Sequence, residues 1–224
     1  FMKIIRNKSF IYCMASVRYV PHLTMNRSVS FISLFLLLPF VFLTKSCFAE
    51  QPPVQQPDGR TVVSYLMYTI ESEDKRLGSL KGREVDKTNC SALHIYLSGA
   101  GEYGDVLGFR LPDSHSDSVV RVFSNITIIF PEFLFGILPP KCTRTRVWQI
   151  SYDQREKQYF VISDLEEKRT GWFRIAKLGS GYYFQFCRSE KTCRNVGVYV
   201  KDGLRRLVLS NNPLKVKFNG GFIT

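Results

Sequence analysis

The sequence has few of the residues that build metal centres. It contains three histidines and six cysteines among 224 residues, and no two cysteines form a CxxC pair. After residue 49, only His94 and His115 remain of the histidines. A structural zinc site needs about four such ligands at short spacings. We therefore expect no metal site, and nothing in the sequence predicts a cofactor.

The first 49 residues contain no acidic side chain, although they hold six basic ones. They account for half of the formal net charge of +12, because the rest of the chain carries 25 basic and 19 acidic side chains, a net charge of +6. A charge of that size chiefly affects solubility. The densest basic stretches beyond residue 49, Lys141 to Arg146 and Arg205-Arg206, are short. Nucleic acid is therefore not an expected partner.

The main apolar run is too short to cross a membrane comfortably. It extends from Phe31 to Thr44, whereas a spanning helix needs about 20 apolar residues. A short basic stretch from Met25 precedes it, and Cys47-Phe48-Ala49 follows it. This order is typical of a secretory signal peptide. We expect residues 25–49 to be that signal, cleaved after Ala49, with an uncleaved anchor as the alternative.

Four cysteines follow the expected cleavage point: Cys90, Cys142, Cys187 and Cys193. An even number in an exported chain predicts disulfides, and four cysteines allow three connectivities. The short spacing of Cys187 and Cys193 favours a local bridge, which leaves Cys90 with Cys142. The chain-entropy argument gives the long loop roughly 4 kcal/mol and the short one roughly 2 kcal/mol.

No stretch beyond residue 50 shows a convincing helical period. Short runs rich in β-branched and aromatic residues are separated by turns such as Gly179-Ser180-Gly181 and Asp202-Gly203. Many short strands at near-regular spacing indicate a sandwich or a closed barrel. We therefore predict a single all-β domain over residues 50–224. Residues 1–24 are expected to be a non-native or untranslated leader ahead of the real start, without a fold. The expected strands of the domain are Tyr65 to Ile70, Leu93 to Leu97, Val106 to Leu111, Val119 to Phe123, Ile126 to Phe130, Val147 to Ser151, Tyr159 to Ser163, Trp172 to Leu178, Tyr182 to Cys187, Val196 to Val200, Leu207 to Ser210 and Leu214 to Phe218.

An ordered set of segments runs through the chain beyond residue 50. Its N-terminal part is Val54, Asp58-Gly59-Arg60, Val62, Tyr68 and Ile70, and its C-terminal part is Trp172 to Ile175, Tyr182 to Cys187, Cys193 to Val198, Arg205 to Ser210 and Pro213 to Phe218. This ordered set resembles the Kunitz-type (soybean trypsin inhibitor) family of plant protease inhibitors, which includes miraculin-like members. The resemblance implies a monomeric β-trefoil, in which a six-stranded barrel is capped by three hairpins in pseudo-threefold arrangement. It also implies a protease inhibitor and not an enzyme.

The resemblance places the inhibitory loop at residues 113–118, with Ser116 near the position ahead of the scissile bond. The loop residues are Asp113, Ser114, His115, Ser116, Asp117 and Ser118. A trypsin-like specificity pocket contains a buried aspartate and requires Lys or Arg from its substrate. This loop has neither, and its two aspartates would repel that pocket. We therefore predict secreted, serine-type endopeptidase inhibition that is not directed at trypsin, with a defence role in a plant.

Three further sites complete the prediction. Ser64 occupies the position where family members often carry an asparagine that braces the loop. Arg188 and Lys191, in the segment expected between two half-cystines, form a candidate second loop. Asn125-Ile126-Thr127 is an N-glycosylation sequon, which makes Asn125 the expected glycan site.

Two other readings compete for the same residues. His115, Asp113 and Ser116 contain the side chains of a catalytic triad, but neighbours on one short loop cannot adopt its geometry, so we reject catalysis. A non-inhibitory defence or storage protein, or a lectin-like binding protein, would share the scaffold without a working loop. Fold alone does not decide between these functions.

Overall fold

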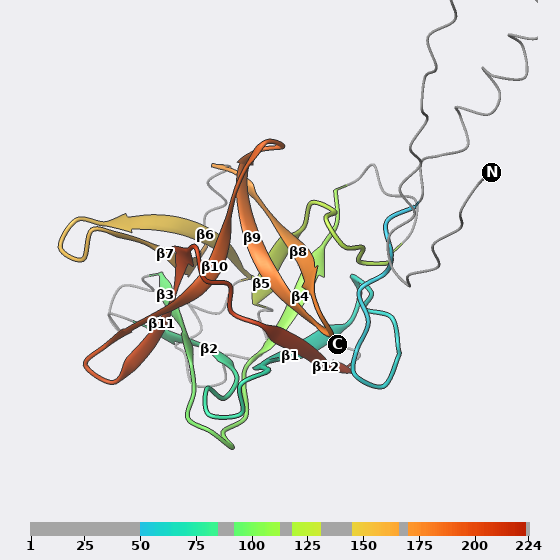
Figure 1. Cartoon of the computed structure of the whole chain (residues 1–224), viewed down its shortest axis with the longest axis horizontal. Helices are drawn as coiled ribbons and strands as arrows, with labels where there is room; N and C mark the ends of the chain where they lie inside the picture. The colour runs from blue at the N-terminus through green and yellow to red at the C-terminus, as the bar shows by residue number, and fades with distance from the viewer. Residues whose placement is uncertain (1–49, 85–91, 113–117, 131–144, 166–169, 223–224) are drawn as a thin grey trace, which may run out of the picture. The chain divides into compact units, whose positions relative to one another are not determined.

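The structure is a computed structural model that describes residues 50–84, 92–112, 118–130, 145–165 and 170–222. These residues form twelve β-strands (Figure 1). No helix long and apolar enough to span a membrane occurs in these ranges. The strands are β1 (Met67–Ser72), β2 (Leu80–Glu84), β3 (Leu93–Leu97), β4 (Val106–Arg110), β5 (Thr127–Phe130), β6 (Arg146–Asp153), β7 (Gln158–Asp164), β8 (Trp172–Leu178), β9 (Gly181–Ser189), β10 (Thr192–Lys201), β11 (Leu204–Ser210) and β12 (Val216–Phe222).

Hydrogen bonding closes ten of these strands into a ring. The order is β10-β11-β3-β7-β6-β5-β4-β1-β12-β9, and β9 pairs again with β10. Strand β8 extends the sheet from β9, while β2 pairs with β3 outside the ring. The all-β prediction is confirmed for the described residues. Their pairing defines a closed ten-stranded barrel, and not by itself the six-stranded barrel with three hairpin caps that the resemblance implied.

Long hairpins form the C-terminal part of the barrel. Strands β10 and β11 pair without interruption from Asn195↔Ser210 to Lys201↔Leu204. Asp202 and Gly203 connect them, with φ values of 50° and 75°. Two consecutive positive φ values match a two-residue hairpin turn whose twist suits the flanking strands. The Asp-Gly pair is one of the few dipeptides that adopt this turn at low cost, so the sequence determines the hairpin locally.

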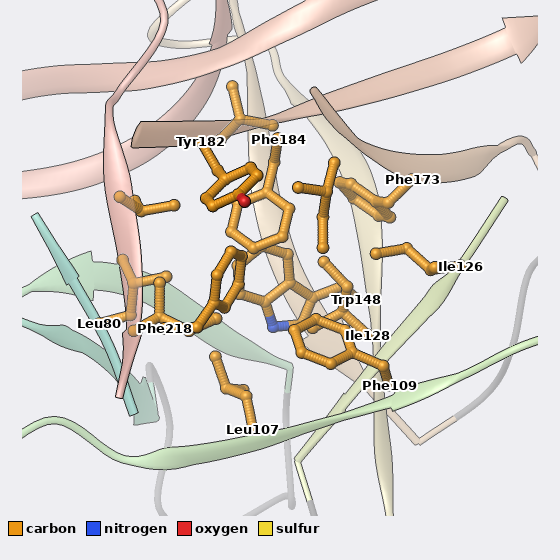
Figure 2. Close-up of a cluster of buried hydrophobic side chains, with 14 of the residues drawn as sticks. Leu80, Leu107, Phe109, Ile126, Ile128, Trp148, Phe173, Tyr182, Phe184 and Phe218 are labelled. Carbon is orange, nitrogen blue, oxygen red and sulfur yellow. The ribbon is translucent and has the colours of Figure 1, made fainter. Parts of the chain in front are cut away.

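Aromatic side chains fill the interior of the barrel (Figure 2). Trp148 lies at the centre, with its ring 5.7 Å from that of Phe173 and 5.5 Å from that of Phe184. Phe218 contacts Phe184 at 6.0 Å and Phe109 at 5.7 Å. These edge-to-face contacts join side chains from β4, β6, β8, β9 and β12. Because each ring is almost fully buried, this cluster supplies a large part of the apolar burial that stabilises the barrel.

Apart from shifted strand ends, the expected strands differ from the observed ones in two places. Strand β2, with the sequence Leu-Lys-Gly-Arg-Glu, lacks the apolar alternation that the other strands show, and it was missed. It forms because it pairs with β3 from Leu80↔Leu97 to Glu84↔Leu93. In contrast, residues 119–123 form no named strand. Val119 and Arg121 each make an isolated bridge, with Val63 and Pro53 respectively.

Candidate inhibitory loop and its supports

Residues 113–117, which hold five of the six predicted loop residues, lie outside the described residues. The flanks of the loop are described. On the N-terminal side, β4 pairs with both β1 and β5, and its last residue, Arg110, lies opposite Thr127. On the C-terminal side, Ser118 is half-buried. The pairing of β4 with β5 therefore brings together the two ends of the connection that carries the predicted loop.

Hydrogen bonds to residues 62–64 hold the C-terminal flank of the loop. The Ser64 backbone N–H donates to the Ser118 carbonyl over 2.7 Å, and the Val120 N–H donates to the Val62 carbonyl over 3.0 Å. The sequence predicts that the Ser64 side chain braces the loop, and that stays a prediction; the observed contact joins Ser64 to the last residue of the predicted loop. The contact uses its backbone amide, so it does not depend on the length of the side chain.

The N-terminal segment adds a third layer to this support. The Val62 N–H donates to the Val54 carbonyl over 2.9 Å, and the Val54 N–H donates to the Val120 carbonyl over 2.8 Å. Val54, Val62 and Val120 are fully buried. Two neighbouring segments and a third, distant one thus form a small, closed set of hydrogen bonds around a valine cluster, which we call the loop support.

Asp58-Gly59-Arg60 produces the turn that allows this arrangement. Gly59 has a φ of 87°, and the Gln56 N–H donates to the Arg60 carbonyl over 2.8 Å. The Asp58 carboxylate accepts the Arg60 backbone N–H over 3.0 Å and pairs with the guanidinium of Arg60 over 2.6 Å. The Arg60 N–H, followed by its side chain, lowers the pKa of Asp58. The motif therefore reverses the chain so that residues 54 and 62 meet.

Tyr68 contributes a contact that sequence reasoning missed. Its side chain is fully buried, and its hydroxyl accepts the Val63 N–H over 2.9 Å. Burial raises the pKa of this hydroxyl, although the Val63 hydrogen bond opposes the shift. In the sequence, Tyr68 belongs only to the family pattern, and nothing near it predicts which amide its hydroxyl would reach. It links the barrel core directly to the residue before Ser64.

Arg121, the basic residue nearest to Ser116 in the sequence, contacts the N-terminal segment. Its guanidinium donates to the carbonyl of Gln51 over 3.0 Å, and its backbone forms a bridge with Pro53. Next to it, the Val122 N–H donates to the Pro52 carbonyl over 2.9 Å. Arg121 therefore fixes the N-terminal segment.

The predicted glycan site, Asn125, lies just after this segment. Its Oδ1 accepts a hydrogen bond from Nε of Arg174 over 2.8 Å, and its side chain is half-buried. Phe123, two residues earlier, has a φ of 63° and is 47% exposed. The Phe123 N–H donates to the carbonyl of Ile175. Arg174 contacts the oxygen of the Asn125 amide, whereas a glycan would be attached to its nitrogen. Glycosylation of Asn125 stays a prediction.

The candidate second loop is a short hairpin between β9 and β10. Cys187 and Cys193 form a disulfide across its base, which confirms this half of the predicted pairing. Arg188 and Lys191 are exposed, and the guanidinium carbon of Arg188 lies 5.6 Å from the centre of the Tyr159 ring. The other predicted pair, Cys90 and Cys142, lies outside the described residues.

The arrangement suits the display of a peptide segment. The described residues contain no cluster of three or more His, Cys, Asp or Glu side chains that could hold a metal ion. The members of the rejected catalytic set, Asp113, His115 and Ser116, lie outside those residues. The described residues form a barrel with a buried aromatic core. Hydrogen bonds from its N-terminal segment hold the C-terminal end of the connection that carries the predicted loop.

Comparison with known proteins agrees with this architecture. The model of the legume Kunitz family, described as trypsin and protease inhibitor, matches residues 54–219. The chain therefore belongs to the Kunitz family of trypsin and protease inhibitors. This matches the resemblance inferred from the sequence, and the family is one of inhibitors rather than enzymes.

Individual relatives are similar over part of their length. Kunitz trypsin inhibitor 5 of Arabidopsis thaliana is 36% identical over 94 residues, which cover 37% of this chain and 48% of the relative. Miraculin of Synsepalum dulcificum is 34% identical over 123 residues, which cover 48% of this chain and 54% of the relative. The chain thus matches about half the length of each of these relatives.

Among solved structures, the complex of porcine pancreatic trypsin with soybean trypsin inhibitor contains a similar fold. The match has a TM-score of 0.62 and 23% identity, and it covers 75% of this chain and 98% of the matched chain. At this identity the likeness establishes a shared fold.

Proposed function

We propose that the protein is a secreted inhibitor of a serine endopeptidase and that residues 113–118 enter the protease in the manner of a substrate. The observation that carries the proposal is the hydrogen bond from Ser64 to Ser118, together with the buried valine cluster beneath it. A loop held in place before binding loses less conformational entropy when it binds, which favours tight inhibition from a modest interface.

The same loop argues against trypsin as the target. It contains Asp113 and Asp117 and has no Lys or Arg. A desolvated aspartate near the negative charge of a trypsin pocket would cost several kcal/mol. Ser116 would suit a small or polar specificity pocket, such as that of an elastase-like or subtilisin-like enzyme.

The proposal extends to the finer fold and to the location of the protein. We infer a β-trefoil, monomeric scaffold, because proteins of similar fold belong to the soybean trypsin inhibitor group. We also infer export through a signal at residues 25–49, an N-glycan on Asn125, a second disulfide between Cys90 and Cys142, and a role in plant defence. The basis for export is the order of basic, apolar and small residues in that segment.

The test is an inhibition panel with a matched pair of variants. The full chain is produced in a secretory host, and the oxidised protein is assayed against trypsin, chymotrypsin, elastase, subtilisin, papain and an aspartic protease. Ser116→Arg adds the basic residue that trypsin requires, whereas Ser180→Arg adds the same side chain to the exposed turn between β8 and β9. We expect wild type to inhibit a member other than trypsin, and only Ser116→Arg to inhibit trypsin.

Other outcomes would assign the activity elsewhere. Inhibition that Arg188→Ala and Lys191→Ala remove would assign it to the β9–β10 hairpin. If wild type and both arginine variants inhibit nothing, the proposal is wrong. The acidic loop would then favour a non-inhibitory defence, storage or lectin-like protein on the same scaffold.

A further inference from the structure

A cavity lies on strands other than those that flank the predicted inhibitory loop. Its volume is about 440 Å³, and its walls come from β3, the β6–β7 hairpin, β7 and β11. The residues that define its chemistry are His94, Asp153, Arg155, Phe160, Ile162 and Arg206. Cavities of this size accommodate small organic molecules. We call it the Arg206 cavity.

Arg206 is a half-buried charged group of this cavity that has no ion-pair partner in the part of the chain that the structure describes. Its guanidinium carbon lies 3.6 Å from the centre of the Phe160 ring, and its Nε is buried with no hydrogen-bond partner. None of the ion pairs among the described residues includes Arg206. Burial lowers its pKa, and the more distant Asp153 and Glu156 only partly oppose this shift. A desolvated guanidinium without a bound carboxylate has unused donors for an anion.

His94 contacts Arg206 but does not neutralise it. A guanidinium NH2 group of Arg206 donates to Nδ1 of His94. Burial, and then the charge of Arg206, lower the pKa of His94 to about 4. The imidazole is therefore neutral near pH 7 and accepts the hydrogen bond. It orients the guanidinium without adding negative charge.

The carboxylate in the cavity lining, Asp153, already accepts hydrogen bonds from the backbone. Oδ1 of Asp153 accepts the backbone N–H groups of Arg155 over 2.9 Å and of Glu156 over 3.1 Å, which closes the β6–β7 turn. The lining therefore holds two arginines against one aspartate that already has two donors. The remaining walls include apolar surface from Ile162 and from Tyr152, which is 49% exposed, whereas Phe160 is buried beneath the Arg206 guanidinium.

We propose that the Arg206 cavity binds a small planar carboxylate, such as an aromatic acid. Its carboxylate would take the free donors of the Arg206 guanidinium, and its ring would occupy the apolar wall. Arginine pairs with carboxylates through two parallel hydrogen bonds, and Phe160 holds the plane of the guanidinium in place. This site is independent of the proposed protease inhibition, because none of residues 113–118 lines the cavity.

The experiment is an NMR titration of the ¹⁵N-labelled, oxidised protein with benzoate. We expect saturable shifts of the backbone amides of His94, Ile162 and Arg206. Arg206→Gln should weaken binding at least about tenfold, because a charge-assisted pair is lost. The matched control is Arg205→Gln, since Arg205 precedes Arg206 on β11 and donates instead to the Arg76 carbonyl over 3.4 Å. It should leave the affinity unchanged.

Further arms separate the chemistry of the ligand from the stability of the variants. Benzamide lacks the charge and should not bind, and inorganic phosphate lacks the ring and should bind more weakly than benzoate. Arg206→Lys keeps the charge but lacks the two-pronged donor, so it should also weaken binding, with native amide spectra showing that it is folded. Absent shifts in wild type, shifts centred elsewhere, equal affinity in Arg206→Gln, or equal binding of benzamide or phosphate would each overturn the proposal.

Discussion

The C-terminal barrel and the loop support are stabilised in different ways. Strands β8 to β11 are seven to ten residues long and pair over extended registers. The loop support, in contrast, uses isolated bridges and a few hydrogen bonds among residues 51–64 and 118–122. The barrel therefore derives its stability from many cooperative contacts, whereas the geometry of the loop depends on a few single ones. It follows that stability and inhibition should respond to different substitutions.

The largest effect should come from the aromatic interior. Phe184 is 2% exposed and contacts both Trp148 and Phe218. Phe184→Ala removes most of that ring and leaves a cavity, which should lower the free energy of unfolding by roughly 3–5 kcal/mol. Urea denaturation measures this change in the free energy of unfolding. The control is Tyr103→Ala at a side chain that is 92% exposed, where a change within about 0.5 kcal/mol is expected. Similar losses for both variants would contradict the assignment of the core.

A smaller effect should separate the loop support from the barrel. Tyr68→Phe keeps the buried ring but leaves the Val63 N–H without its acceptor, at a cost of about 1–3 kcal/mol. Hydrogen exchange at the amides of Val63 and Ser64 should accelerate, and inhibition of the target protease should weaken.

The matched control removes a hydroxyl from the barrel instead. In Tyr199→Phe the lost hydroxyl is bonded to Glu156 over 2.9 Å. Exchange at Val63 and Ser64 should then stay at its wild-type rate. If both variants accelerate exchange at these amides equally, the loop support is not an independent unit.

The smallest expected effect is a loss of stability at low pH, and it arises from His94 in the barrel. The pKa of His94 is about 4, below its ordinary value of 6.5, because burial and Arg206 disfavour the charged imidazole, while Asp153 partly opposes them. The unfolded chain therefore binds this proton more readily than the folded one. The contribution of His94 to stability is complete above pH 6.5 and is lost as the pH falls towards 4.

Two measurements check the acid effect. NMR titration of the His94 imidazole gives its pKa directly, and Arg206→Gln should raise that pKa by removing a neighbouring positive charge. Asp153→Asn should lower it further. An unshifted pKa near 6.5 in wild type would contradict the burial of His94. Because solvent partly screens this half-buried side chain, the change in stability should be smaller than that for Tyr68→Phe.

Local sequence patterns predicted most of the barrel. Strands β3 and β8 match the expected ranges from end to end. Their residues alternate between buried and half-buried positions, along the whole of β3 and over the first four residues of β8. Strand β2 was missed because Gly82 and the charged residues beside it show no such pattern. Its pairing depends on β3, and a Cβ at Gly82 would lie 2.9 Å from Cδ1 of Leu93. That requirement exists only once the strands are paired.

Only part of the candidate site could be predicted from the sequence. The family pattern located Ser64 near the loop, and the structure brings its backbone to Ser118. Tyr68 is only five residues from Val63, but no residue pattern shows which amide its hydroxyl reaches. The bonding of Val54 and Val62 to Val120 could not be predicted, because it joins segments separated in the chain. The Arg206 cavity is a similar case, since His94 and Arg206 are 112 residues apart in the sequence.

By itself, the sequence determined the all-β class, the Asp202-Gly203 turn, the Cys187–Cys193 bridge and membership of the inhibitor family. All of these depend on residue types at short range or in a fixed order along the chain. Only the tertiary structure decided which amide supports the loop and which segments pair with residues 119–123. It also decided where an arginine without an ion-pair partner among the described residues lies. Those properties depend on contacts between distant segments, and such contacts arise only when the barrel closes.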